Sequence, residues 1–364
     1  MKVLLCFASL LLMGIPVSFG QNIPGSDRIT TYCTTDDYTG MPKIDAHCHI
    51  NTERPAFMEE ALKDNFSIVT INTDAYGSLS VDEQLRLAVA QKKMFPDQLA
   101  FLATFPMKGW EDAGWQEETL ARIEEAFSKG ASGIKVWKNI GMVEKDKDGK
   151  FIMIDNPKFD PVFNYMEGKG MPVCGHLGEP RNCWLPLEEM TVNNDKSYFK
   201  EHPEYHMFLH PDFPSYDDQI MARDNLLQKH PDLHFVGAHL GSLEWSIDEL
   251  AMRFDRFPNM SADLAARICH IQKQAQDDWQ KVRDFFILYQ DRIIYGTDLG
   301  DDGDGDPAAL KDYVHGVWMK DWKFFTTDEI MTSQEVDGEF RGLKLPREVI
   351  GKIYCTNAER LFMK

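Results

Sequence analysis

An alternation of two sequence patterns constrains the fold of this chain more than any other feature. Short apolar or β-branched runs recur along it, and stretches with apolar residues at helical spacing lie between them. The short runs are residues 43–50, 67–72, 99–105, 133–137, 171–176, 233–239, 259–264 and 292–298. The helical stretches are residues 81–94, 116–129, 215–229, 243–257, 277–290 and 347–364. Nearly continuous apolar strands that alternate with helices predict a parallel sheet covered by those helices.

Eight predicted strands, most of them followed by a helix, favour a TIM (β/α)₈ barrel of the α/β class. The alternative is a doubly wound open sheet, which would need a glycine-rich phosphate-binding loop after the first strand. That position holds His-Cys-His-Ile-Asn-Thr instead, so we expect the barrel.

The chain has 364 residues, whereas a minimal barrel needs about 250, so we expect a distorted barrel with added segments. One is an N-terminal arm over residues 21–42, which leaves residues 43–364 as the barrel domain. The other is a long insertion after the fifth strand, over residues 178–216. Because the loops that follow the strands form the active-site mouth of a TIM barrel, we expect this insertion to shape the substrate pocket.

Residues 1–20 have the features of a cleavable secretory signal peptide. Lys2 gives a positive start, an almost unbroken apolar run follows over residues 3–17, and Ser18-Phe19-Gly20 forms a small-x-small cleavage site. The run is too short and too poorly flanked for a membrane span, with an uncleaved anchor as the alternative. No second long apolar stretch follows. We therefore expect the mature protein to be secreted or periplasmic and to have no membrane span.

The formal net charge of −19 bears on the partners of the chain. Such an acidic chain repels phosphate backbones, so we expect no nucleic-acid partner and a small-molecule substrate instead. A homo-oligomer is compatible with the sequence. Cleavage of the signal would leave six widely spaced cysteines without a CxxC pair, for which we expect at most one disulfide. These are Cys33, Cys48, Cys174, Cys183, Cys269 and Cys355.

Two histidines end the first predicted strand. Residues i and i+2 of a strand face the same way, so His47 and His49 are predicted to point into the barrel, while Cys48 points outward. We expect Asp45 on the inner face, one layer deeper. Two adjacent imidazoles at a strand end supply half of a metal site, although an HxH pattern alone is a weak signal.

Three other predicted strands end in residue types that bind metals. The fifth ends at His176, the sixth at His239 and the eighth at Asp298. Catalytic residues of TIM barrels lie at the C-terminal ends of the strands. Each residue taken alone could have a structural role, but their convergence on one ring predicts a metal centre.

Several segments then resemble a known family. They are Gly-Ile-Lys at 133–135, Gly-His-Leu-Gly-Glu-Pro at 175–180, Gly-Ala-His-Leu-Gly at 237–241, Tyr-Gly-Thr-Asp at 295–298 and Asn-Ala-Glu-Arg-Leu-Phe at 357–362. With the HxH pattern they resemble the amidohydrolase superfamily, in particular its amidohydrolase-related branch of decarboxylases and lactonases. That branch includes aminocarboxymuconate-semialdehyde decarboxylase, resorcylate-type decarboxylases and sugar lactonases. The resemblance covers nearly the whole mature chain.

The resemblance implies one divalent metal ion held by His47, His49, His176 and Asp298. Zinc suits three nitrogens and one oxygen, and manganese is the alternative where oxygen ligands and water share the site. His239 would lie beside the metal-bound water and move a proton. Asp298 would both bind the metal and accept the proton of the water.

Four further residues are candidates for binding the substrate. In binuclear members of the superfamily a carbamylated lysine on strand 4 bridges two metals, but for Lys135 we favour an ammonium group that lies in the pocket or pairs with an acid. Glu179 could serve as an acid or base, or be a loop carboxylate. Arg181 and Arg267 could clamp a substrate carboxylate in bidentate fashion, or form structural ion pairs.

Two other clusters are interpreted without a metal. His202, His206 and His210 are spaced for one helix face, but Pro203 and Pro211 interrupt it, so we expect a loop. The acidic segment 301–306 has the composition of a calcium loop but lacks the twelfth-position glutamate of an EF-hand. We expect a solvated lid there.

These features predict a metal-dependent hydrolase in which metal-activated water opens an ester, lactone or amide bond of a small polar substrate, with sugar derivatives as one class. The first alternative is a metal-dependent, non-oxidative decarboxylase of a small carboxylic acid. The second is a non-catalytic barrel that binds a metal or ligand, against which the full ligand set and His239 argue. Export weakly favours hydrolysis of external material.

Overall fold

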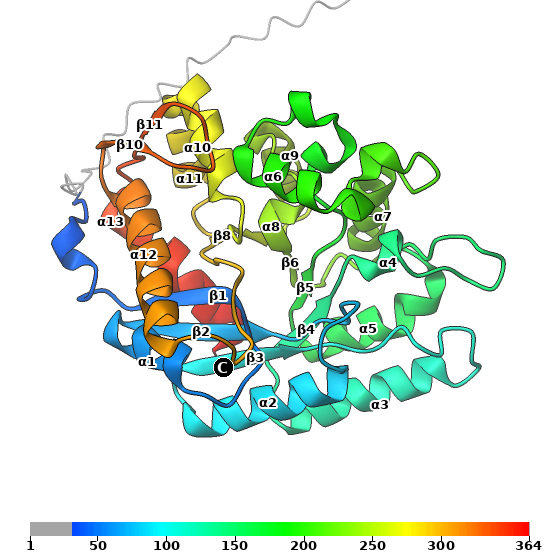
Figure 1. The fold of residues 1–364 in the computed structure, drawn as a ribbon. Helices are drawn as coiled ribbons and strands as arrows, with labels where there is room; N and C mark the ends of the chain where they lie inside the picture. Colours follow the sequence, from blue (N-terminus) through cyan, green and yellow to red (C-terminus); the bar gives the residue numbers. More distant parts are fainter. Residues whose placement is uncertain (1–30, 364) are drawn as a thin grey trace, which may run out of the picture. The chain divides into compact units, whose positions relative to one another are not determined.

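The computed structural model describes residues 31–363, and its main element is a nine-stranded parallel sheet. The strands follow one another in the order β8-β7-β6-β5-β4-β3-β2-β1-β9 (Figure 1). They are β1 (Lys43–Ile50), β2 (Phe66–Ile71), β3 (Leu99–Ala103), β4 (Gly133–Val136), β5 (Val173–Gly175), β6 (Phe235–Gly237), β7 (Met260–Asp263), β8 (Ile293–Ile294) and β9 (Leu299–Asp301).

The two outermost strands in this order, β8 and β9, belong to one short segment of the chain. β8 pairs with β7 and β9 pairs with β1, and only residues 295–298 separate them. Within those residues, the Ala46 N–H donates to the Tyr295 carbonyl (3.0 Å) and the Asp298 N–H donates to the His47 carbonyl (2.7 Å). One segment therefore pairs with both edges of the sheet. The predicted TIM-like barrel is confirmed, with its eighth strand divided into two parts.

Helices follow most strands and pack around them. They include α1 (Ala56–Lys63), α2 (Val81–Met94), α3 (Trp115–Ser128), α5 (Asp160–Lys169), α7 (Tyr216–Lys229), α9 (Ile247–Arg256), α10 (Ile268–Asp277), α11 (Trp279–Leu288) and α12 (Pro307–Thr326), with α13 (Arg347–Gly351) and α14 (Asn357–Phe362) near the C-terminus. In α9 the buried Ile247, Leu250 and Phe254 lie on one face at helical spacing. The sequence analysis did not identify α12 as a helix.

Two apolar layers fill the structure. Inside the barrel, side chains at every second position of the strands form one cluster, which Ala358, Leu361 and Phe362 of α14 complete. Its strand members include Ile44, Ala46, Val69, Ile71, Ala100, Leu102, Val236 and Ile294. A larger cluster joins the outer face of the strands to the helices. In this outer layer Trp318 of α12 stacks on Phe66 with ring centroids 4.2 Å apart.

A β-bulge interrupts this alternation in β1. Asp45 and Cys48 are three positions apart, whereas their partners in β2 are only two positions apart. Asp45 consequently faces outward, where it accepts hydrogen bonds from Trp318 Nε1 (2.9 Å) and Thr297 Oγ1 (2.6 Å). The prediction that Asp45 shares the inner face is therefore wrong. Cys48 lies on the outer side as predicted, with Sγ 3.9 Å from Thr297 Oγ1.

The insertion after β5 contains α6 (Asn193–Glu201) and several single turns of 3-10 helix. His206 and His210 each follow one of these turns, and their rings bind the carbonyls of Leu185 (2.7 Å) and Pro203 (3.0 Å), which agrees with the predicted loop. The acidic segment 301–306 begins at the last residue of β9, the buried Asp301, which pairs with Arg54 (2.7 Å).

The segment before β1 is described from residue 31 onward. Tyr38 is buried there, and its hydroxyl donates to Asp64 of the α1–β2 turn (2.7 Å). The predicted signal peptide and the first part of the predicted arm lie outside the described residues. Within residues 31–363 every cysteine is a free thiol, and none of the helices is both long and apolar enough to cross a membrane.

Candidate metal centre

Five predicted residues meet at the carboxyl ends of the barrel strands. Asp298 Oδ1 lies 3.3 Å from His47 Nε2 and 3.2 Å from His49 Nε2. The His239 ring lies 4.8 Å from the His47 ring and 4.2 Å from the His176 ring, measured between centroids. Strands 1, 5, 6 and 8 thus bring four imidazoles and one carboxylate into a single cluster.

The other ring nitrogen of three histidines is held by a fixed acceptor. His47 Nδ1 lies 2.8 Å from Asp263 Oδ2. His49 Nδ1 lies 2.8 Å from the Ile71 carbonyl oxygen, and His239 Nδ1 lies 2.9 Å from the Ala265 carbonyl oxygen. A carbonyl can only accept, so Nδ1 of His49 and His239 carries the proton and Nε2 keeps a free lone pair. Metal-binding histidines are typically oriented in this way.

Asp263, the last residue of β7, forms hydrogen bonds to two of the histidines, His47 in β1 and His239 after β6. Its Oδ2 binds His47, and its Oδ1 accepts the backbone N–H groups of His239 (2.7 Å) and Ala265 (3.2 Å). Burial alone would raise the pKa of Asp263, but the contact with His47 lowers it to about 2. Asp263 was not selected from the sequence, because the predicted seventh strand ended one residue later, at Leu264.

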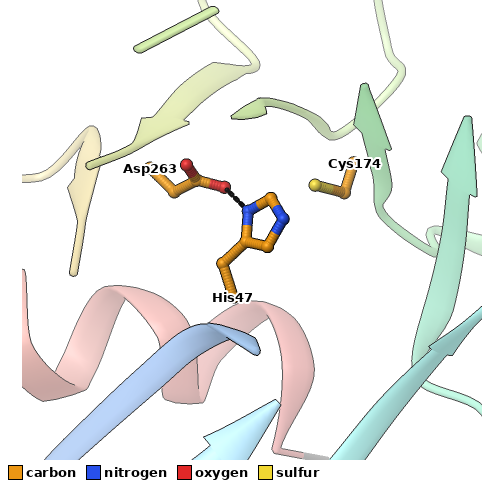
Figure 2. A group of neighbouring side chains, drawn as sticks. All are labelled: His47, Cys174 and Asp263. Carbon is orange, nitrogen blue, oxygen red and sulfur yellow. Dashed lines mark hydrogen bonds and ion pairs between the residues drawn. The ribbon is translucent and has the colours of Figure 1, made fainter. Parts of the chain in front are cut away.

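Figure 2 shows His47 between Asp263 and Cys174. Burial raises the pKa of the Cys174 thiol to about 12 in the metal-free protein. The Lys135 ammonium lies 3.6 Å from this sulfur and 3.3 Å from His47 Nε2. Lys135 is 1% exposed and has no carboxylate within 4.0 Å among residues 31–363. The predicted pairing with an acid is therefore not seen in the described residues, and the ammonium lies beside His47 and Cys174.

The residues of the cluster carry a donor set that fits a divalent cation. Burial, together with Lys138 and Lys135, lowers the pKa of His176 well below its ordinary value, and its Nε2 has no hydrogen-bond partner in the described chain. Burial likewise lowers the pKa of His239. Burial opposes ionisation of Asp298, but the neighbouring imidazoles hold its pKa well below the ordinary value. Neutral imidazoles beside an ionised carboxylate form a suitable set of ligands.

Backbone strain accompanies three consecutive strand ends. His239 (φ 58°), Ala266 (φ 54°) and Asp298 (φ 71°) all adopt the left-handed region that non-glycine residues avoid. Such conformations cost about 1–3 kcal/mol each and concentrate at functional sites. At Asp298 the 2.7 Å hydrogen bond from its N–H to the His47 carbonyl holds the conformation.

The other predicted substrate-binding residues lie around this cluster. Glu179 is buried and pairs with Lys138, a residue that the sequence analysis did not select. The Arg181 guanidinium stacks on the Trp245 ring, 4.0 Å from its centroid. Arg267 is buried, and one of its Nη atoms donates to the Ala266 carbonyl (3.0 Å).

A cavity of about 260 Å³ lies against the cluster. It is lined by Asp298, by Ala266 and Ile268 from the loop after β7, by Asn194 from the insertion and by Lys320 from α12, among others. Its volume lies just below the range of about 300–1,000 Å³ that is typical of ligand pockets.

Comparisons with known proteins agree with this architecture. A model of the amidohydrolase family matches residues 44–364. A search of curated proteins finds no significant match. Among solved structures, 2,6-dihydroxybenzoate decarboxylase from Rhizobium is 14% identical, with 88% of this chain and 98% of that chain covered and a TM-score of 0.50. At that identity the likeness supports the fold alone.

Two other solved structures are more distant. The 5-carboxyvanillate decarboxylase from Novosphingobium aromaticivorans, determined with bound manganese, is 12% identical over 89% of this chain and 98% of that chain, with a TM-score of 0.48. The 4-oxalomesaconate hydratase from Rhodopseudomonas palustris is 12% identical over 88% of this chain and 95% of that chain, with a TM-score of 0.46.

Proposed function

The chain belongs to the amidohydrolase family, and we propose on this basis that it is a metal-dependent hydrolase. Its substrate would be a small polar ester, lactone or amide, with sugar derivatives as one class to test. One observation carries the proposal: the Nε2 atoms of His47 and His49 converge on one oxygen of Asp298, while other protein groups hold their Nδ1 atoms.

His47, His49, His176 and Asp298 would hold the divalent ion, with zinc as the first expectation and manganese as the alternative. When bound, such an ion supplies Lewis acidity that activates water and polarises a substrate carbonyl. The unpartnered, buried Nε2 of His176 supports its inclusion, because a buried polar atom without a partner is rare in folded proteins.

His239 and Asp298 would handle protons. The Ala265 carbonyl fixes the His239 ring with Nδ1 protonated, so the unprotonated Nε2 can accept a proton and later return it to the leaving group. Asp298 is 33% exposed at its side chain and borders the cavity, so its ionised carboxylate can reach a molecule bound there.

Metal analysis of a double variant tests the proposal directly. Wild-type protein should contain about one metal ion per chain after dialysis, and the variant with His47→Ala and His49→Ala should lose it along with hydrolysis of an ester and lactone panel. A matched variant with His202→Ala and His210→Ala removes two histidines from the insertion and should retain the metal. Unchanged metal content and activity in the first variant would refute the proposal.

The same panel separates hydrolysis from the alternative, decarboxylation, which would use the same metal-binding residues. Aromatic and aliphatic acids are included, and both CO₂ release and incorporation of ¹⁸O from water are measured. Incorporation of ¹⁸O into the product supports hydrolysis. Release of CO₂ without incorporation of ¹⁸O would assign decarboxylation instead.

A further inference from the structure

A cavity of about 270 Å³ lies at the end of the barrel opposite the metal centre. Its polar lining residues are His234, Asn259, Ser261, Arg292 and Arg360, and none of its lining residues is acidic. His234, Asn259 and Arg292 directly precede β6, β7 and β8, so the cavity lies at the amino ends of these strands. It has several times the volume of about 30 Å³ that one water molecule occupies in the liquid, so a small ion fits inside it.

Arg292 places a fixed guanidinium in the wall of this cavity. Its Nε donates to the Met260 carbonyl (2.5 Å), Nη2 donates to the Phe257 carbonyl (2.6 Å), and Nη1 lies 3.5 Å from the Phe254 carbonyl. A guanidinium has five N–H donors, so two remain for a ligand. Its protein partners are carbonyl oxygens, and no carboxylate lies within 4.0 Å of it among residues 31–363. The carbonyls therefore orient the guanidinium without supplying a counter-charge.

Arg360 of α14 adds a second guanidinium to the same cavity. Its Nη2 donates to the Asp291 carbonyl (3.2 Å), and within the described chain it forms no ion pair. The two guanidinium groups are close enough to repel each other, since burial and then the charge of Arg360 lower the pKa of Arg292 below its ordinary value. Two like charges that share one cavity without an acid in its lining favour an anion between them.

The nearest acids are bound to other groups. The Asp291 carboxylate pairs with Lys352 (2.9 Å), and Asp255, which partly offsets the repulsion at Arg292, accepts the Tyr289 hydroxyl (3.0 Å). This absence of acids from the cavity contrasts with the formal net charge of −19 of the whole chain.

Two further polar groups of the lining are unoccupied. The hydroxyl of the buried Ser261 and the ring of the half-buried His234 make no hydrogen bond within residues 31–363. A hydroxyl and an imidazole can both donate to an oxyanion. The cavity thus offers donors from the beginnings of β6, β7 and β8 and from α14.

We propose that this cavity binds inorganic phosphate, held by Arg292 and Arg360 with hydrogen bonds from Ser261 and His234. Guanidinium groups bind phosphate oxygens in bidentate fashion. Two of them match the charge of a phosphate dianion, whereas a carboxylate would neutralise only one. This site is separate from the metal centre, so the inference goes beyond the proposed hydrolysis and does not depend on it.

A bound phosphate would fasten α14 to the barrel. Leu361 and Phe362, which follow Arg360 in this helix, complete the apolar cluster inside the barrel. Arg292 in turn connects the loop before β7 to the start of β8 through its carbonyl contacts. An anion shared by the two arginines would therefore stabilise the folded chain, and binding should raise its unfolding temperature.

Thermal unfolding and titration calorimetry with potassium phosphate test the inference at neutral pH. Potassium chloride and potassium acetate at the same ionic strength serve as control salts. Phosphate should bind and stabilise the wild-type protein more than either control salt does. Arg360→Met should weaken phosphate binding by about 10- to 100-fold, the loss expected for hydrogen bonds to a charged group. Arg360 is exposed, so this variant should fold, which circular dichroism checks.

Two more variants sharpen the result. Arg360→Lys keeps the charge without the planar fork and should bind phosphate with intermediate affinity. Arg122→Met removes an exposed guanidinium that pairs with Asp82 on another face of the barrel wall, and it should bind phosphate like the wild type.

The measurement is made on the protein as isolated and again after dialysis against EDTA, because phosphate could also bind a metal ion. Phosphate binding that persists after EDTA treatment and depends on Arg360 supports the inference, whether or not the protein is a hydrolase. Binding that vanishes with the metal would place the phosphate on the ion and overturn the inference. Equal stabilisation by phosphate and the control salts, or unaltered binding to Arg360→Met, would also overturn it.

Discussion

Replacing Asp263 by asparagine tests how the metal centre is oriented. The carboxylate satisfies three donors at once: His47 Nδ1 and the backbone N–H groups of His239 and Ala265. Asparagine has one acceptor oxygen and one NH₂ group. If its oxygen binds the two backbone groups, its NH₂ faces His47 Nδ1, which must then become the acceptor. The proton of His47 moves to Nε2, where it blocks the lone pair directed at Asp298.

The size of the effect follows from these contacts. Loss of such an orienting partner typically weakens metal affinity by about 10- to 100-fold. One compromised hydrogen bond to a charged group lowers the free energy of unfolding by about 1–3 kcal/mol. The folded pKa of Asp263, about 2, lies below its ordinary 3.8. Its ionised form therefore stabilises the fold above about pH 4, by about 2 kcal/mol, and this contribution is lost as pH falls toward 2.

The assay combines competition with a zinc chelator and urea unfolding of the metal-free protein between pH 2 and 7. Asp263→Asn should bind zinc more weakly and lose less stability than the wild type between pH 4 and pH 2. Asp277→Asn, an exposed aspartate at the end of α10, is the control and should match the wild type in both respects. Zinc affinity within twofold of the wild type in a folded Asp263→Asn variant would refute the orientation argument.

Three more predictions follow from buried groups and from the N-terminus. Burial raises the pKa of Asp321 to about 7, so ionisation of this carboxyl group lowers the stability of the fold increasingly from about pH 4 to pH 7. Asp321→Asn should therefore raise the midpoint of urea unfolding at pH 8, by an amount equivalent to up to about 4 kcal/mol. At pH 4 the same substitution should change the midpoint little. A midpoint equally raised at both pH values would contradict this. Trp318→Phe removes the donor to Asp45 and should cost about 2–4 kcal/mol in urea unfolding, whereas no loss would argue against the outward Asp45. Intact mass of exported protein should place the mature N-terminus at Gln21, and a mass that retains residues 1–20 would contradict the signal peptide.

The barrel can be predicted from the sequence because the alternation of strands and helices that defines it is encoded in short, local segments of the chain. A run of apolar residues followed by a helical stretch can be recognised in the sequence without knowing which elements pack against the strand or the helix. The same reasoning selected His176, His239 and Asp298, since the strand-end rule of a parallel barrel depends only on where each run stops.

The errors have one physical origin, which is dependence on distant contacts. The outward turn of Asp45 results from a bulge against β2 and from a donor on α12, 273 positions away in the chain. Asp263 lies inside the predicted seventh strand, and only its contact with His47 in the structure reveals its role. Arg181 and Arg267 were equivalent in sequence, but only the structure places the first on Trp245 and buries the second near Asp195, Glu244 and Glu179, which raise its pKa.

The divided eighth strand couples closure of the barrel to the state of the metal centre. Residues 295–298 join the two edges of the sheet and also carry Asp298. β9 pairs with three residues of β1, so local unfolding at this seam would separate Asp298 from His47. An ion shared by His47 and Asp298 would link the two sides of the seam and slow amide hydrogen exchange at both residues. Loss of the ion would then loosen the barrel at this seam, so the unloaded protein would be more susceptible to proteolysis there than the metal-loaded protein.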